Sequence, residues 1–125
     1  MWKRRRRRDD EAVPESAFTD ATVANITERK RYEIGVGGQT AGSARYVDTG
    51  NQRIFYRTEV DDKFARHGLG GRLASAALDD TRAAGKRVVA LCPFVAAYVD
   101  RHEDYDDILD PVTPQAHLAV RGEMG

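Results

Sequence analysis

Closely spaced glycines stand out in residues 60–73, which read VDDKFARHGLGGRL. Gly68, Gly70 and Gly71 would let backbone N–H groups approach an anion without interference from Cβ atoms. A helix that begins near Leu69 would add unpaired N–H groups and the positive end of its dipole. The pattern therefore predicts a cradle for a phosphate-bearing cofactor, and the alternative is a tight turn that binds no ligand.

Strands with a period of two precede this loop. Alternating apolar residues predict strands over 31–36, 39–47 and 52–60, and Gly37-Gly38 supplies the first hairpin turn. The turn signal Asp48-Thr49-Gly50-Asn51 separates the second strand from the third. Strict alternation in the third strand places Ile54, Tyr56, Thr58 and Val60 on one face and Phe55, Arg57 and Glu59 on the other.

A helix, a buried strand and a second helix are predicted after the loop. The first helix covers residues 69 to about 84 and ends at Gly85 in the C′ position. Residues 87–91 predict a short strand that is parallel to strand 52–60. Pro93 can open a second helix that reaches about His102. The apolar stripe of the first helix contains Leu69, Leu73, Ala76, Ala77 and Ala84.

Length and composition predict one domain with a modest core. The chain has 125 residues, 41% of them hydrophobic, and a formal net charge of zero. The single cysteine excludes an internal disulfide, and His67, His102 and His117 lack the spacing of a helix-borne metal pair, so no metal is predicted. We expect a soluble, cytoplasmic protein with no membrane association, because the sequence has no apolar run of about 18 residues.

Both ends of the chain are predicted to lie outside the folded domain. Residues 1–28 are charged and are expected to form a mostly disordered tail, residues 29–109 the domain, and residues 110–125 a flexible tail. The basic run at residues 3–8 could touch nucleic acid or acidic lipid. Acidic residues at positions 9–11 offset its charge, so a dedicated nucleic-acid binder is not favoured.

Two other nucleotide-binding loops are excluded by spacing. A dinucleotide-binding fingerprint needs a third glycine where this chain has Leu73, and it opens a series of parallel βαβ units rather than closing an antiparallel meander. A Walker-type loop needs a Gly-Lys-Ser or Gly-Lys-Thr triplet, which does not follow here.

The order of elements resembles the central part of the GNAT acyl-CoA-dependent N-acetyltransferases. The motif of that superfamily, Gln/Arg-x-x-Gly-x-Gly/Ala, aligns its glycines with Gly68 and Gly70. The resemblance covers roughly residues 31–109 and implies an α+β fold with an αβα-like GNAT core. Its elements would be a three-stranded antiparallel meander, the glycine loop, a helix, a parallel strand and a helix. Further residues look like the minimal YjdJ-type subgroup, namely 58–60, 68–73, 91–95, Tyr98, Arg101, His102 and Tyr105.

The resemblance implies acetyl-CoA as cosubstrate and suggests where it binds. In the superfamily the loop amides hold the pyrophosphate, and the pantetheine pairs with the strand before the loop. The first motif position is Ala65 instead of Gln or Arg, and Arg66 either supplies the missing charge or lies in solvent. The residues implied in binding are Thr58, Val60, Arg66, His67, Gly68, Leu69, Gly70, Gly71 and Arg72.

Three side chains are candidates for catalysis. Cys92 ends the buried strand where the acyl group should lie, so it could relay a proton or accept the acyl group, or it could be a small buried residue. Ile54 stands where many relatives have a glutamate base, and Glu59 could act through water instead, or pair with Arg57 or face solvent. Tyr98 could protonate the departing thiolate, or serve only in packing.

The resemblance implies an N-acetyltransferase that moves an acetyl group to an amine, either a small molecule or a protein. The chain is too short for the elements that shape an acceptor pocket in larger relatives, so a partner or a second copy of the chain could complete the site. The alternative is a catalytically weak CoA-binding or protein-interaction module of the same fold, which the absent base favours.

Overall fold

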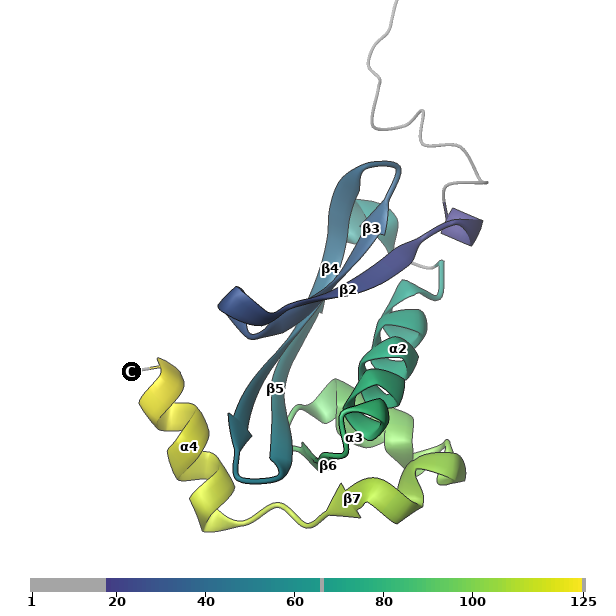
Figure 1. Cartoon of the computed structure of the whole chain (residues 1–125). Helices are drawn as coiled ribbons and strands as arrows, with labels where there is room; N and C mark the ends of the chain where they lie inside the picture. The colour runs from purple at the N-terminus through teal and green to yellow at the C-terminus, as the bar shows by residue number, and fades with distance from the viewer. Residues whose placement is uncertain (1–17, 66, 125) are drawn as a thin grey trace, which may run out of the picture.

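The computed structural model describes residues 18–65 and 67–124 as one six-stranded sheet with helices on both faces (Figure 1). The strands lie in the order β2-β3-β4-β5-β6-β7, so spatial neighbours are also consecutive along the chain. The strands are β2 (Thr22–Ile26), β3 (Arg31–Val36), β4 (Gln39–Thr49), β5 (Gln52–Val60), β6 (Arg87–Ala90) and β7 (Leu109–Asp110). The α-helices are α2 (Leu69–Ala83), α3 (Pro93–Asp100) and α4 (Pro114–Met124), and short 3-10 helices cover Thr27–Arg29, Asp62–Phe64 and Glu103–Ile108.

The predicted meander is confirmed as β3, β4 and β5, which pair antiparallel. Gly37 and Gly38 turn the first hairpin with φ angles of 56° and 82°, values that glycine adopts without steric cost. The predicted parallel neighbour of β5 is also confirmed, since β6 pairs with residues Gln52 to Phe55. The α+β arrangement expected from the sequence is therefore the one that forms.

A β-bulge in the middle of β5 changes which side chains share a face. Tyr46 of β4 opposes Phe55, whereas the preceding Arg45 opposes Arg57, so Tyr56 is an extra residue in β5. The bulge reverses the alternation from that point onward, so the prediction that Thr58 and Val60 share a face with Ile54 and Tyr56 is wrong. Instead, Phe55, Thr58 and Val60 share the face that α2 and α3 cover, and Tyr56, Arg57 and Glu59 share the other.

Helices α2 and α3 cover one face of the sheet and enclose the larger core. Helix α2 begins at Leu69 as predicted, and Gly85 follows its end with a φ of 73°. Its buried stripe differs in part from the prediction because Ala74 and Leu78 are buried, whereas Ala76 is half-buried and Ala84 is exposed. Phe55, completely buried, lies at the centre of this core beside Tyr32 and Tyr46.

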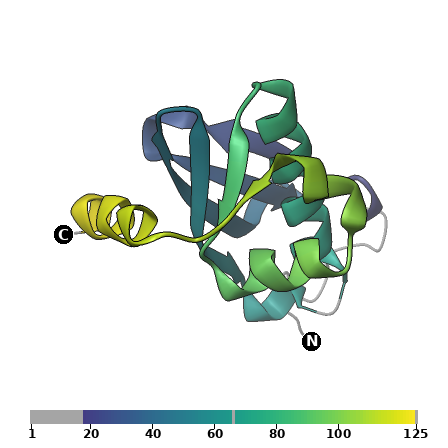
Figure 2. The ribbon, with the colours of Figure 1, turned by 90° about the horizontal axis from the view of Figure 1, so that it is seen from below.

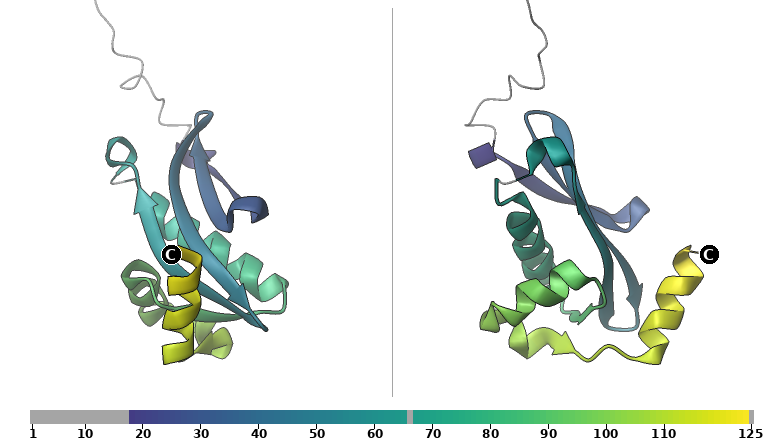
Figure 3. Two further views of the ribbon diagram at one scale, coloured as in Figure 1. Left: turned by 90° about the vertical axis from the view of Figure 1, so that its left-hand side faces the viewer. Right: turned by 180° about the vertical axis from the view of Figure 1, so that it is seen from behind.

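Helix α4 lies on the opposite face, where it packs on a smaller cluster (Figures 1 and 3). Figure 2 shows the extended segment after β7 that carries the chain to this helix. The prediction of a flexible tail over residues 110–125 is wrong for Pro114–Met124, because Ala116 and Val120 lie one helical turn apart and pack against Ile54 and Val89.

The predicted N-terminal tail is also folded in part. Thr22–Ile26 form β2, which pairs with the whole of β3 except Val36, and Val23 packs against the larger core. The expected disorder up to about residue 28 is therefore wrong for these residues, while residues 1–17 and their basic run lie outside the described part of the chain. No helix within residues 18–65 and 67–124 combines the length and the hydropathy needed to cross a bilayer.

Candidate functional site

The glycine loop leads into helix α2, whose N-terminus has no side-chain cap. Gly68 is the N-cap of α2 and has a φ of 71°, a conformation that side chains disfavour. No side chain caps α2, and its first turn contains no acidic residue. The N–H groups of this turn lack intrahelical acceptors and carry the positive end of the dipole of a 15-residue helix. This end of α2 can therefore receive an anion.

Two basic residues predicted at the cradle make contacts with the N-terminal segment. The His67 ring stacks on Phe18, with ring centroids 3.8 Å apart. The Arg72 guanidinium donates hydrogen bonds to the carbonyl oxygens of Phe18, Thr19 and Ala21, the last at 3.0 Å. Arg72 therefore ties the segment before β2 to α2. Arg66 lies outside the described residues.

A groove runs from the glycine loop along α2 toward α3. Its lining contains Gly68, Gly71, Arg72, Ser75, Ala76, Asp79 and Tyr98. A Cβ atom at Gly70 would lie 2.7 Å from Cζ of Phe94, so the missing side chain lets α3 approach α2 closely. At Gly71 the corresponding distance to Tyr98 is 3.7 Å, an ordinary contact. Gly70 therefore has a packing role here, whereas Gly71 leaves the floor of the groove open.

Strands β5 and β6 separate at Phe55. The carbonyl oxygen of Phe55 accepts hydrogen bonds from the N–H groups of both Leu91 (3.0 Å) and Cys92 (2.8 Å), and the parallel pairing ends there. Beyond that point β5 continues for five more residues, paired only with β4 in the sheet. We call this divergence, from the Phe55 carbonyl outward, the fork.

The backbone beyond the fork presents hydrogen-bonding groups to the open side. Asp61 donates its N–H to the carbonyl of Ala41 on β4, at 2.8 Å. Because backbone groups alternate along a strand, those of Thr58 and Val60 point away from β4. These are the two strand positions that the sequence assigned to cosubstrate binding, and an extended ligand could pair with them.

Cys92 and Thr58 meet at the fork. Cys92 is buried, with 2% of its surface exposed, and it is the N-cap residue of α3. Its thiol donates a hydrogen bond to the Thr58 hydroxyl, with sulfur and oxygen 3.3 Å apart. The bulge at Tyr56 makes this contact possible, because it turns Thr58 toward the face that α2 and α3 cover. We call this the helical face, and the face that carries α4 the outer face. The sequence predicted both residues at the site but not their contact.

Tyr98 lies in the groove beside α2, with its ring stacked on His102 at a centroid distance of 3.9 Å. The His102 ring is held in turn, since its Nδ1 lies 2.7 Å from the Tyr98 carbonyl oxygen. The other ring that Tyr98 contacts among the described residues is that of Tyr105, and burial raises the pKa of Tyr105. These contacts place Tyr98 among the groove residues, on the face of α3 that meets Gly71.

Glu59 points to the other face of the sheet, where it pairs with Arg57. The Glu59 carboxylate accepts hydrogen bonds from Nε and Nη2 of Arg57 at 3.0 and 2.7 Å, as one alternative for this residue predicted. Hydrogen bonding and charge from Arg57 hold the pKa of Glu59 below its usual value. A lowered pKa makes a carboxylate a weaker base.

The structure therefore brings some predicted site residues together and separates others. The glycine loop, Arg72 and Tyr98 border one groove, and Thr58 and Cys92 meet at the fork, while Glu59 faces away. Within residues 18–65 and 67–124 no three metal-ligating side chains gather. The bulge is the feature that sequence reasoning missed. The available signal was the charge of Arg57 and Glu59, two positions apart, because strict alternation would place both on the face of the buried Phe55.

Comparison with known proteins agrees with this architecture. A search of curated proteins finds no match. Among solved structures, the NMR solution structure of a GCN5-like protein from Staphylococcus aureus superposes with a TM-score of 0.57 at 18% identity. The match covers 74% of this chain and 91% of that one, and at this identity it shows a shared fold.

The sequence model of one family matches residues 31–108, which span every element from β3 to the 3-10 helix before β7. Its description is GCN5-related N-acetyl-transferase. The match includes the glycine loop, the fork and Cys92, and the placement in the YjdJ-type subgroup stays a prediction. The chain belongs to the GCN5-related N-acetyltransferase family.

Proposed function

We propose that this protein transfers an acetyl group from acetyl-CoA to an amine, with the reaction taking place at the fork. The observation that carries the proposal is the contact between Cys92 and Thr58 at the point where β5 loses its parallel partner. There a buried thiol, open strand backbone and the groove from an uncapped helix N-terminus belong to one side of the molecule.

The chain offers binding groups of the kind that acetyl-CoA requires. The first-turn N–H groups of α2, from Leu69 to Gly71, suit the pyrophosphate. The backbone of Thr58 and Val60 suits the amides of the pantetheine. Gly71 leaves the groove beside the first turn of α2 free of a side chain on the side that meets Tyr98.

Acetyl transfer forms a bond between the amine nitrogen and the acyl carbon and breaks the bond from that carbon to sulfur. The departing thiolate then needs a proton, and the amine must lose one. We propose that Cys92 serves this step, either by relaying a proton or by accepting the acyl group before the amine does. The Thr58 hydroxyl would orient the Cys92 thiol, since it already accepts its hydrogen. Tyr98 and Glu59 stay candidates of lower rank, the first because it lies in the groove and the second because it faces away.

Paired substitutions at Gly71 test the cosubstrate site. Gly71→Glu and Gly71→Gln place side chains of nearly equal size beside the first turn of α2. An acidic residue there should stabilise the helix through its dipole but repel a pyrophosphate. Isothermal titration calorimetry with acetyl-CoA should therefore show weaker binding for Gly71→Glu than for Gly71→Gln, although the former melts at the higher temperature. Equal affinities would argue against a phosphate at this helix end.

The second candidate is a CoA-binding module without efficient catalysis. It is favoured by Glu59, the only acid in β5, because this carboxylate is engaged by Arg57 on the other face. Calorimetry with acetyl-CoA and CoA, followed by a thiol-release assay over a panel of amines, separates the two functions. Binding without turnover supports the module. No binding of either ligand removes both candidates.

A further inference from the structure

Three arginines stand in one row across the face of the sheet opposite to Cys92. Arg31 of β3 lies directly opposite Arg45 of β4, and Arg45 lies directly opposite Arg57 of β5. Directly opposed residues project from the same face and lie close together, so their like charges repel and destabilise the sheet. We propose that this arginine row binds an oxyanion, either a carboxylate or a phosphate group.

The neighbouring row explains why the centre of the site is open to a ligand. A second row lies two positions away on each strand, where Glu33, Ser43 and Glu59 are also directly opposite one another. Glu33 pairs with Arg31 at 2.7 Å and Glu59 with Arg57 at 2.7 Å. Arg45 has Ser43 in the corresponding place, and a hydroxyl cannot neutralise a guanidinium.

Among the described residues Arg45 therefore forms no ion pair of its own, and Glu59, whose carboxylate interacts with its charge, is already paired with Arg57. Its Nε atom is buried, and among the residues that the structure describes it has no hydrogen-bond acceptor. A buried N–H donor without a partner costs free energy, which an acceptor atom from a ligand would recover. A guanidinium also offers parallel N–H groups that match the geometry of a carboxylate or phosphate.

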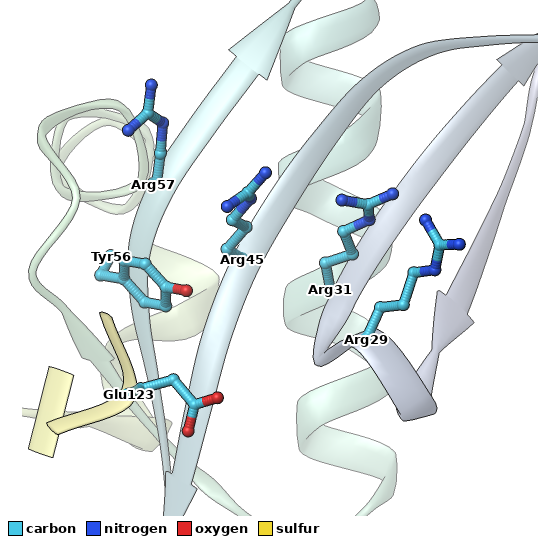
Figure 4. A pocket seen from close by; sticks show the side chains of 6 residues that line it. All are labelled: Arg29, Arg31, Arg45, Tyr56, Arg57 and Glu123. Atoms are coloured by element: carbon cyan, nitrogen blue, oxygen red, sulfur yellow. The ribbon is translucent and has the colours of Figure 1, made fainter. Parts of the chain in front are cut away.

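A pocket surrounds this point, as Figure 4 shows. Four arginines line it, because Arg29 from the 3-10 helix after β2 adds to the row. The Tyr56 hydroxyl points into the same pocket and could donate a further hydrogen bond. The single carboxylate in the lining is Glu123 of α4, which pairs with Lys30 at 2.9 Å. The lining is therefore cationic after its ion pairs are counted.

The bulge in β5 links this pocket to the fork. It places Arg57 on the outer face and the next residue, Thr58, on the face of Cys92. Because β5 has no strand partner on that side beyond Phe55, its free edge adjoins both faces of the sheet. If the proposed acetyl transfer holds, the oxyanion bound at Arg45 is the acid group of an amine acceptor, and the acceptor class is amines that also carry a carboxylate or phosphate.

Inorganic phosphate is the probe for the site itself, and it needs no acetyl-CoA. We expect the arginine Nε–H signals of Arg31, Arg45 and Arg57 in a ¹H–¹⁵N NMR spectrum to shift saturably with phosphate. Arg45→Gln should weaken binding about ten-fold or more, because hydrogen bonds to charged groups are lost. Arg121→Gln is the matched control, since Arg121 lines a different surface, and it should bind like the wild type. Shifts that do not saturate, or that sodium chloride at equal ionic strength reproduces, would overturn the site.

Ser43→Glu provides a second test, in which every arginine stays in place. It supplies the missing carboxylate beside Arg45, so it should abolish the phosphate-dependent shifts. Ser43→Gln adds a side chain of similar size without charge and should leave most of the binding. Equal phosphate binding by the Ser43→Glu variant and the wild type would contradict the proposal.

Acceptor assays then identify the source of the oxyanion. Matched amines that differ only in a carboxylate, a phosphate or a neutral end should be compared by kcat/KM with acetyl-CoA. Arg45→Gln should lower kcat/KM about ten-fold for the acid-bearing member that is preferred and leave the neutral member unchanged. An unchanged preference would overturn the assignment to the acceptor, although the phosphate titration would still establish the site. If the wild type acetylates none of these amines, that result would instead count against the proposed transferase activity.

Discussion

The two faces of the sheet differ in how they are covered and in what they leave free. The helical face has α2 and α3 over a core with completely buried Phe55, and its free polar groups lie at the fork and the glycine loop. The outer face carries one helix on a cluster of four buried residues and leaves a row of arginines beside it. The difference suggests that the helical face supplies rigidity and the thiol, and that the outer face supplies recognition.

One strand serves both faces because of its bulge. Residues before Tyr56 and residues after it alternate in opposite phase, so β5 sends Phe55 and Thr58 to the helical face. Arg57 then joins the arginine row without interrupting the pairing with β4.

The largest difference should appear in stability. Phe55→Ala removes a completely buried ring from the larger core and should lower the free energy of unfolding by about 3–5 kcal/mol. Val120→Ala removes two methyl carbons under α4 and should cost about 1–2 kcal/mol. Urea denaturation of both variants at the same temperature measures these two losses in the free energy of unfolding. Equal losses would show that the two faces contribute alike to the fold.

Cys92→Ala should remove most turnover while acetyl-CoA binding persists. We expect a fall in kcat of about 100-fold or more, the size of effect that a positioned proton-transfer group provides. Cys92→Ser should also lose turnover, since its hydroxyl is a poorer acid and nucleophile than the thiol at neutral pH. Calorimetry with CoA serves as the control for folding. Full activity in the alanine variant would leave Cys92 with a packing role alone.

Asp110, at the strand edge that leads to α4, should make stability depend on pH. Hydrogen bonds from Gln52 and then Arg87 hold the pKa of Asp110 below its usual value. The carboxylate therefore stabilises the fold above pH of about 4, and this contribution is lost as the pH falls through the lower pKa of the folded state. Asp110→Asn should cost up to about 1 kcal/mol at pH 7, because the ion pair with Arg87 is partly exposed, and the cost should shrink as the pH falls below about 4. Asp106→Asn, at an exposed position, is the control for thermal unfolding at both pH values.

The smallest effect should come from Glu59. Its carboxylate is half-exposed and paired on the outer face, so Glu59→Gln should change kcat less than about three-fold. Steady-state kinetics over pH 6 to 9 would measure this. A fall of more than ten-fold, with the acidic limb of the pH profile displaced, would assign Glu59 as the base acting through water.

The sequence predicted the elements of the domain more closely than their faces. The bounds of β3 and β5 were readable because period-two alternation and glycine turns agree, and the first residue of α2 follows from the glycine loop. The bulge at Tyr56 was not readable because it needs the register of β4, which depends on two strands at once.

The ends of the fold were missed for a related reason. Strand β2 has only five residues, and α4 leaves the apolar Leu118 exposed, so neither shows a sustained apolar period. Helix α4 is held by Ile54 and Val89, which lie far from it in the sequence. Ala116 and Val120 carry a weak helical signal at a spacing of four, but Gly122 and polar neighbours hide it. At the candidate site, Cys92 and the glycines could be found by type, whereas the Thr58 contact and the arginine row arise only from pairing.

The carbonyl of Phe55 accepts two N–H groups, so the fork is fixed by main-chain atoms alone. Side chains around it can vary without moving the junction, provided that the ring of Phe55 stays in the core. A scaffold of this kind suits divergence and design, since new acceptor preferences can be introduced on the outer face by surface substitutions. The position of the thiol relative to the strand backbone would be inherited unchanged.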